Sequence, residues 1–372
     1  MFSFNMSRDL LAKEQKTWIF FMTHEADYSL STFAYDIYSY IRQKAYFLDE
    51  DESKFKGADI LDFNEYPNLT QIKAAIARYK DLEKHYMELS IDDTPAGQLL
   101  SAAVTLSNIA TLYNECAQYT EALNLFLKVK DIREKTLDSK HPDLATTYNN
   151  IGFIYARQKN YAMALEWYEK AKVIRIEILG DEHPDTATVY DNIGIVYLHQ
   201  GLYNNALDFF DKALFIRIKA LGSVHPDTAE TYNCIANVFY NLKKYDKALD
   251  FYENALKIWE IVFGNEHPKT AKAYNNIATV YVNKQNYSKA MECFGKALDI
   301  FKNFFGDEHP DTASVYNSIA TVKALQGNYI KALELYGKAL KIRKKVLGVD
   351  HPDTIATLNI IAIASGFKKS TY

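Results

Sequence analysis

The chain repeats itself at a constant interval of 42 residues. A His-Pro pair recurs six times at this interval, from His141-Pro142 to His351-Pro352. Three further sets of residues, which we call columns, recur at the same interval. The alanine column is Ala122, Ala164, Ala206, Ala248, Ala290 and Ala332, and the aromatic column is Phe126, Tyr168, Phe210, Tyr252, Phe294 and Tyr336. The glycine column is Gly180, Gly222, Gly264, Gly306 and Gly348. One period shared by several columns predicts stacked copies of a single unit, each contacting its neighbours, rather than a globule around one core.

Each unit is expected to contain two helices. In the second unit, Pro142 suits a first helical turn because proline has no N–H group to leave unpaired there. Apolar side chains follow at spacings of three and four, which places them on one helix face. A polar turn at 158–160 separates this helix from a second one. Gly180 ends the second helix, since glycine adopts the left-handed conformation at low cost.

Composition narrows the classes of function. The 43 Lys and Arg against 47 Asp and Glu give a net charge of −4, which does not favour nucleic acid or acidic lipid as partners. No apolar run approaches the roughly 20 residues of a membrane span, and Trp18–Met22 lacks the flanks of a signal peptide. The three cysteines have no metal or redox spacing, so we expect no metal, no cofactor and a reducing compartment, most simply the cytoplasm.

The repeated residues resemble a known family. The run Tyr148-Asn149-Asn150-Ile151-Gly152, followed by Tyr155, Tyr161, Ala164, Tyr168 and Ala171, resembles the tetratricopeptide repeat. The 42-residue length and the Leu-Gly-x-x-His-Pro-Asp-Thr-Ala connector are similar to the kinesin-light-chain type. The resemblance spans about residues 99–364. It implies an all-α, right-handed superhelical solenoid that binds protein partners and is not an enzyme. The heptad coiled coil of kinesin light chains is not evident in residues 1–98.

The chain divides by this period into residues 1–98, six units over 99–350, and a half-repeat over 351–372. For the first part we favour a helical cap, with apolar spacing at 30–41 and an amphipathic helix that starts at Asn68 after Pro67. The rival is a small α/β module with strands at 17–22 and 58–61. The half-repeat is expected to hold one helix, from Pro352 to about Ala364. That helix is apolar, so we expect a partner or a longer natural chain to cover it, and it or the N-terminal segment could support self-association.

The resemblance also implies that the first helices of the units line a concave groove. The two positions before each Ile-Gly or Ile-Ala pair carry mostly asparagine, which offers both a donor and an acceptor to an extended peptide. The candidate groove residues are Asn108, Asn149, Asn150, Phe153, Arg157, Asp191, Asn192, Ile195, His199, Asn233, Asn237, Asn241, Lys272, Asn275, Asn276, Asn283 and Asn317. Phe153 and Ile195 suggest an apolar part near the second and third units. In the alternative interpretation, the asparagines bond a neighbouring helix.

Two further sets of residues at the 42-residue interval carry charged or titratable side chains. Histidines of successive units would lie about 10 Å apart, too far to share a metal ion, so we expect them to pack at helix starts. Four arginines precede an aspartate by ten residues: Arg133, Arg175, Arg217 and Arg343. In the fourth unit Trp259 and Lys269 replace both partners, and Phe301 breaks the column in the fifth. The pattern indicates either an ion pair at the surface or a solvated face.

We therefore predict a protein-interaction scaffold or adaptor that captures a partner segment in the concave groove. Two other functions remain open from the sequence. The array could be a regulatory sensor that changes curvature when a peptide binds and so controls a partner enzyme. The N-terminal segment could instead be a small catalytic module acting on clients held by the repeats, although it carries no nucleotide loop, nucleophile elbow or metal motif.

Overall fold

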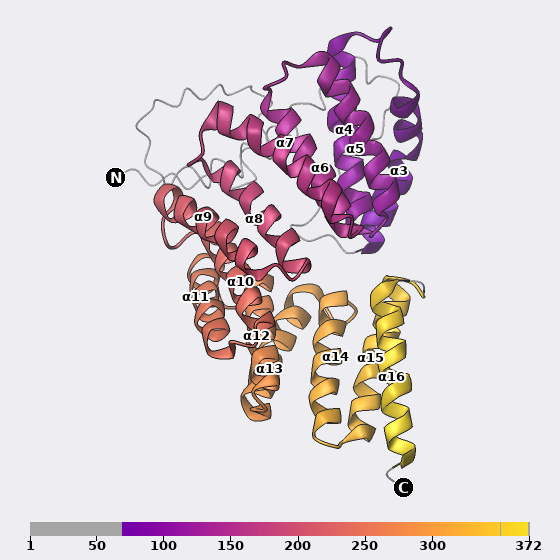
Figure 1. Cartoon of the computed structure of the whole chain (residues 1–372). Coiled ribbons are helices and arrows are strands. Elements are labelled where there is room, and N and C mark those ends of the chain that lie inside the picture. The colour runs from indigo at the N-terminus through magenta and orange to yellow at the C-terminus, as the bar shows by residue number, and fades with distance from the viewer. Residues whose placement is uncertain (1–68, 350, 371–372) are drawn as a thin grey trace, which may run out of the picture. The chain divides into compact units, whose positions relative to one another are not determined.

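The computed structural model describes residues 69–349 and 351–370, all of which belong to the second of two compact units, Gly57–Tyr372. Every regular element in these ranges is an α-helix, and the helices form consecutive hairpins (Figure 1). The first helices of the hairpins are α4 (Ala96–Glu115), α6 (Pro142–Arg157), α8 (Pro184–His199), α10 (Pro226–Asn241), α12 (Pro268–Asn283) and α14 (Pro310–Leu325). The second helices are α5 (Tyr119–Thr136), α7 (Tyr161–Leu179), α9 (Tyr203–Leu221), α11 (Tyr245–Phe263), α13 (Tyr287–Phe305) and α15 (Tyr329–Val346).

Each hairpin packs on the next one along the chain, so the predicted all-α solenoid of helix-turn-helix repeats is confirmed. The second helix of every hairpin contacts the first helix of the following hairpin. Two further helices, α3 (Leu69–Glu88) and α16 (Pro352–Ser370), flank the six hairpins. None of the helices in the described ranges is long and apolar enough to cross a membrane.

The His-Pro pairs start the first helices by a repeated capping contact. In α6, the Nδ1 atom of His141 accepts a hydrogen bond of 3.1 Å from the backbone N–H of Asp143. The histidines that precede α8, α10, α12, α14 and α16 accept the same bond at 3.1–3.2 Å. These bonds satisfy one of the N–H groups that every helix start leaves unpaired. The histidines therefore lie at helix starts, as predicted, and no described group of His, Cys, Asp and Glu could hold a metal ion.

The two helices of a hairpin approach closely because small residues, glycine or alanine, stand where they meet. A Cβ atom added at Gly152 would lie 2.9 Å from the ring of Tyr168, and one added at Gly194 would lie 2.7 Å from the ring of Phe210. The alanines of the repeated column are fully buried, and the aromatic rings fill the remaining space. Small residues opposite large aromatic ones thus give each hairpin its dense packing.

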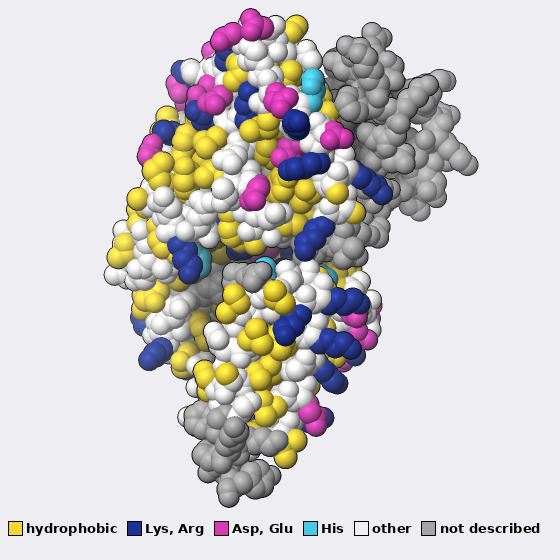
Figure 2. Space-filling model, turned by 90° about the vertical axis from the view of Figure 1, so that its right-hand side faces the viewer, with side chains coloured by type: hydrophobic (Ala, Val, Ile, Leu, Met, Phe, Trp, Pro, Cys, Tyr) yellow, Lys and Arg dark blue, Asp and Glu magenta, His cyan; other side chains and the backbone are white. Residues whose placement is uncertain are grey.

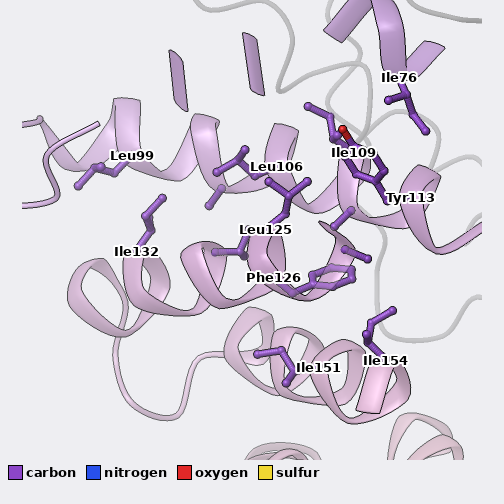
Figure 3. Close-up of a cluster of buried hydrophobic side chains, with 14 of the residues drawn as sticks. Ile76, Leu99, Leu106, Ile109, Tyr113, Leu125, Phe126, Ile132, Ile151 and Ile154 are labelled. Carbon is purple, nitrogen blue, oxygen red and sulfur yellow. The ribbon is translucent and has the colours of Figure 1, made fainter. Parts of the chain in front are cut away.

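At the N-terminal end of the described residues, α3 packs on α4. Ile72 and Ile76 join one hydrophobic cluster with Leu106, Tyr113 and Phe126, part of which Figure 3 shows. The predicted amphipathic helix after Asn68 is therefore present. The expected helix at 30–41 and the rival strands at 17–22 and 58–61 lie outside the described residues, and the boundary at residue 98 stays a prediction.

At the other end, α16 is longer than predicted. It runs to Ser370 instead of ending near Ala364. The sequence Ser365-Gly366-Phe367-Lys368-Lys369 contains no proline, and a single interior glycine costs only about 1 kcal/mol of helix stability. A lone glycine without a following proline is thus too weak a stop signal for the predicted boundary.

Candidate binding surface on the first helices

The first helices form a continuous strip along the stack of hairpins. Helix α6 contacts α8, α8 contacts α10, and α12 contacts α14, in addition to the contacts that each makes with second helices. We call the solvent-facing side chains of α6, α8, α10, α12 and α14 the first-helix surface. Because neighbouring first helices touch, a bound chain would meet side chains of several units without a gap.

Two amide pairs join neighbouring first helices. The Nδ2 group of Asn192 in α8 donates a hydrogen bond of 2.8 Å to Oδ1 of Asn149 in α6. The same bond, at 2.9 Å, runs from Asn276 in α12 to Asn233 in α10. All four side chains are half-buried. The asparagines thus bond a neighbouring helix, as the alternative interpretation held. Each bond uses only one of the two polar groups of each amide.

Asp191 differs from the other predicted groove residues because it is buried. Its side chain is paired with the guanidinium of Arg217, and one carboxylate oxygen accepts a hydrogen bond of 3.1 Å from the hydroxyl of Thr231. Burial raises the pKa of the Asp191 carboxyl to about 6 and outweighs the attraction of Arg217, which lowers it. This carboxylate is therefore occupied within the protein and belongs to the packing between hairpins rather than to the strip that faces solvent.

The residues near the ends of the first helices contact aromatic rings. Arg157 donates to the hydroxyl of Tyr119 at 2.8 Å, and the ring of His199 stacks on that of Tyr161 with centroids 6.3 Å apart. Burial, together with the nearby charge of Arg157, lowers the pKa of His199. Asn283 donates to the hydroxyl of Tyr240 at 2.9 Å. These polar groups are positioned by rings of the preceding hairpin rather than left to rotate freely.

The remaining predicted residues lie on the same helices, except Asn108, which lies on α4. Phe153 is 39% exposed, whereas Ile195 is half-buried against the cluster around Phe210. Asn237 accepts a hydrogen bond from the hydroxyl of Tyr252, and the side chain of Asn241 donates to the Asn237 carbonyl. Asn108 and Asn150 are half-buried, and Lys272 is exposed. The side-chain oxygens of Asn275 and Asn317 are buried without a hydrogen-bond partner among the described residues.

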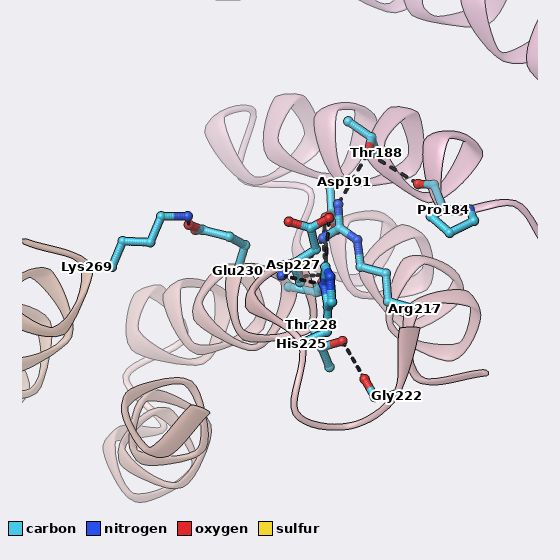
Figure 4. A network of polar contacts seen from close by, with 11 residues as sticks. Pro184, Thr188, Asp191, Arg217, Gly222, His225, Asp227, Thr228, Glu230 and Lys269 are labelled. Carbon is cyan, nitrogen blue, oxygen red and sulfur yellow. Dashed lines mark hydrogen bonds and ion pairs between the residues drawn. The ribbon is translucent and has the colours of Figure 1, made fainter. Parts of the chain in front are cut away.

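Three of the four arginines in the column are internal, which corrects the prediction of a surface ion pair or solvated face; Arg175 is half-buried and donates to the backbone carbonyl of Asp185. Arg133, Arg217 and Arg343 are each less than a tenth exposed. In each, Nη1 donates to the backbone carbonyl of the aspartate ten residues later, at 2.8–3.1 Å, and to a threonine hydroxyl four residues beyond that, at 2.6–2.8 Å. Figure 4 shows this network around Arg217. In these three arginines the guanidinium donates hydrogen bonds to a carbonyl and a hydroxyl of the next helix along the chain. These bonds offset the cost of burying its charge.

Where Trp259 and Phe301 replace arginine, the first-helix surface contains a pocket of about 240 Å³, which we call the recess. Both rings are 2% exposed. The recess is lined by Glu230, Asn233, Trp259, Lys269, Lys272, Asn275, Asn276, Phe301, Asp311, Ser314 and Val315. The residue pattern predicted an apolar part nearer the second and third units, and this recess was not predicted. The feature of the sequence that indicates the recess is the replacement of arginine by Trp259 and Phe301 at two successive positions of the arginine column.

The charge of the surface is uneven despite the near-neutral total. Helix α15 carries one acidic residue, Glu334, and five exposed or half-exposed lysines. These are Lys331, Lys338, Lys341, Lys344 and Lys345. Figure 2 shows Lys and Arg side chains gathered on the lower part of the visible face, which the C-terminal helices form. Any charge preference toward a partner is therefore a local property of one end.

The tetratricopeptide repeat family model matches residues 101–171, 143–219, 227–303, 271–344 and 311–365. The chain therefore belongs to the tetratricopeptide repeat family. Repeats of this family generally form non-catalytic scaffolds for protein interaction. No curated protein sequence is significantly similar to the chain.

The chain is similar to three solved structures, among others. The apo form of RapI is 20% identical, with a TM-score of 0.50, and the match covers 78% of this chain and 76% of that one. BtubC (BKLC) from P. vanneervenii is 20% identical, with a TM-score of 0.49 over 70% of this chain and 95% of that one. A putative kinesin light chain from Podosopora anserina, with nearly identical repeats, is 22% identical, with a TM-score of 0.45 over 54% and 95%.

Proposed function

We propose that this protein is an adaptor that holds an extended segment of a partner protein along the first-helix surface. The observation that supports the proposal is the row of amide side chains on the first helices, in which the 149–192 pair joins α6 to α8 and the 233–276 pair joins α10 to α12. Because these bonds fix the side-chain rotamers, little conformational entropy is lost when a partner binds.

The chemistry of the row suits a main chain. In the Asn149–Asn192 pair, the NH₂ group of Asn149 and the carbonyl of Asn192 lie outside the bond that joins them. These groups can accept from and donate to the N–H and C=O groups of a peptide whatever its side chains are. Exposed apolar groups such as Phe153 would then supply sequence preference. The partner is therefore a segment with exposed backbone groups.

We propose no catalytic role for the repeats. Asp191 on α8, whose pKa is raised by burial, is 7% exposed and already paired with Arg217 and Thr231. We also propose a cytoplasmic location, which is supported by three free cysteines, Cys116, Cys234 and Cys293.

Site-specific photo-crosslinking in the native host tests the adaptor function. A benzophenone amino acid is placed at Phe153, 39% exposed on the first helix α6, or at Phe215, 61% exposed on the second helix α9. Crosslinked proteins are identified by mass spectrometry. We expect a specific partner from position 153 and none from position 215, since only the former lies on the first-helix surface.

The same crosslinking is repeated in two asparagine variants that are matched in chemistry. One carries Asn150→Ala, Asn192→Ala and Asn275→Ala on first helices, and the control carries Asn204→Ala, Asn205→Ala and Asn254→Ala at exposed positions of second helices. We expect the first variant to lose crosslinking by at least about fivefold and the control to keep it. An unchanged yield in the first variant, with its helical content intact, would refute the adaptor function as proposed.

A further inference from the structure

The recess beside Trp259 and Phe301 lies where other hairpins are closed by an arginine. Arg217 in α9 reaches the side chain of Asp191 in α8 and the hydroxyl of Thr231 in α10. At the corresponding positions 84 residues later, Phe301 in α13 stands between Asn275 in α12 and Val315 in α14. A phenyl ring cannot donate hydrogen bonds, so it does not supply Asn275 with the donor that Arg217 gives to Asp191, and Oδ1 of Asn275 has no partner among the described residues.

Two of the residues that line the recess carry buried polar atoms without a partner. Oδ1 of Asn275 is an acceptor with no donor among the described residues, and Nε1 of Trp259 is a donor with no acceptor among them. Buried polar groups in proteins are nearly always hydrogen-bonded, and an exception beside a pocket requires an explanation. The terminal torsion of an asparagine side chain is soft, so the Asn275 amide can turn toward the recess at little cost.

The charges around the recess cancel. Glu230 and Lys269 form an ion pair of 2.6 Å, and the remaining charged lining residues are Lys272 and Asp311, one of each sign. Bringing an isolated ion into such a neutral setting, between two buried rings, is disfavoured because its hydration would not be replaced. The complementary guest is therefore neutral, and it carries one acceptor and one donor.

We propose that the recess binds a side-chain carboxamide, from a glutamine or asparagine of the partner segment. A carboxamide presents a C=O group to the Trp259 N–H and an NH₂ group to the Asn275 oxygen, and its aliphatic stem packs on the two aromatic rings. The recess, at about 240 Å³, is large enough for one such side chain between α10, α12 and α14. The proposal rests on the adaptor function only for the origin of the carboxamide in a partner.

Nuclear magnetic resonance tests the recess without a partner protein. The indole ¹H–¹⁵N signal of Trp259 is assigned by its loss in Trp259→Phe, and the full chain is titrated with N-acetylglutamine N-methylamide. The glutamate and leucine analogues serve as matched probes. We expect a saturable shift of the Trp259 signal in the millimolar range with the glutamine analogue, and at least about tenfold weaker effects from the other two. No shift, or an equal shift from the leucine or glutamate analogue, overturns the proposal.

A variant that fills the recess gives an independent check. Phe301→Arg places a guanidinium where Arg217 and Arg343 have theirs, and Ile261→Arg adds the same charge at a position of α11 that is 70% exposed. We expect the first to abolish the shift and the second to preserve it. Asn275→Leu, as a second variant, should remove the difference between the glutamine and leucine analogues. A shift that persists in Phe301→Arg contradicts the proposal, whereas failure of the crosslinking alone contradicts only the adaptor function.

Discussion

The stack of hairpins uses two kinds of packing at equivalent places. Between the third and fourth hairpins, Arg217 is buried against Asp191, Thr231 and the backbone carbonyl of Asp227. Between the fifth and sixth hairpins, Phe301 occupies the same position and contacts an apolar cluster that includes Val315. The two regions have the same helices, the same caps and the same spacing. A tetratricopeptide hairpin therefore tolerates either a polar or an aromatic link to its neighbour, provided that the partner side chains change with it.

The energetic consequence differs between the two regions. A buried ion pair gains little net stability, because desolvation of both charges offsets their attraction, but loss of one partner leaves the other uncompensated. An aromatic link has no charge to desolvate. Each link has a buried side-chain oxygen without a partner among the described residues, Oδ1 of Asp191 beside Arg217 and Oδ1 of Asn275 beside Phe301. The stability of the arginine link thus depends on keeping both charges, whereas the recess lies beside the aromatic link.

The largest predicted effect comes from removing the arginine alone. Arg217→Met leaves the buried Asp191 carboxylate without its guanidinium and should lower the free energy of unfolding by about 3–5 kcal/mol. The change is measured as the shift in the midpoint of urea denaturation, followed by circular dichroism.

A triple variant sharpens that comparison. Asp191→Asn, Arg217→Phe and Thr231→Val together reproduce the Asn275, Phe301 and Val315 set, and should return the stability to within about 1 kcal/mol of the wild type. If the triple variant is as unstable as Arg217→Met, the two links are not interchangeable and the comparison fails.

The second prediction concerns pH. The pKa of Asp191 is raised to about 6 from its ordinary 3.8, so the folded state binds its proton more tightly than the unfolded state does. The resulting stabilisation is complete below about pH 4 and is lost as the pH rises through 6. Relative to Asp191→Asn, the wild type should therefore lose about 2–3 kcal/mol between pH 4 and pH 7.5. Urea denaturation at both pH values measures this difference, and a constant or opposite difference would show that burial does not dominate.

The third prediction compares the amide pairs of the two regions. Asn192→Ala removes the 149–192 bond near the arginine link, and Asn276→Ala removes the 233–276 bond beside the recess. Each should cost about 1 kcal/mol in urea denaturation, because the bond geometry is the same and the half-buried partner can be rehydrated. Asn204→Ala, at an exposed position, is the control with an effect below about 0.5 kcal/mol. If the two variants lose different amounts of unfolding free energy, the residue that links the hairpins, arginine or phenylalanine, also affects the strength of the nearby amide bond.

The smallest predicted effect lies in the turn within a hairpin. Lys243 adopts a φ of +58° in the fourth hairpin, where the third hairpin has Gly201 with a φ of +75°. Lys243→Gly should raise the stability by about 0.5–1 kcal/mol, because the left-handed conformation costs a lysine more than a glycine. The reverse change, Gly201→Lys, should lower the melting temperature. A lower melting temperature for Lys243→Gly would show that the lysine side chain stabilises this turn.

The sequence predicted the repeat, the paired helices and the helix starts, because periodicity and proline position act locally. It did not predict that His141 caps α6 through a backbone N–H, or that Arg217 is buried against a backbone carbonyl. Main-chain partners have the same chemistry at every residue and leave no pattern in a sequence. The recess could not be predicted because it depends on how much of the space of a guanidinium the ring of Phe301 fills. That depends on packing in three dimensions rather than on residue type.

Hydrogen–deuterium exchange on the chain with and without its crosslinked partner tests the central claim most directly. The adaptor account predicts added protection in α6, α8, α10 and α12, with the peptides that contain Asn192 and Asn276 among the most protected. The second helices α7, α9 and α11 should keep their exchange rates. Protection confined to the second helices or to α16, with the first helices unchanged, would contradict the account.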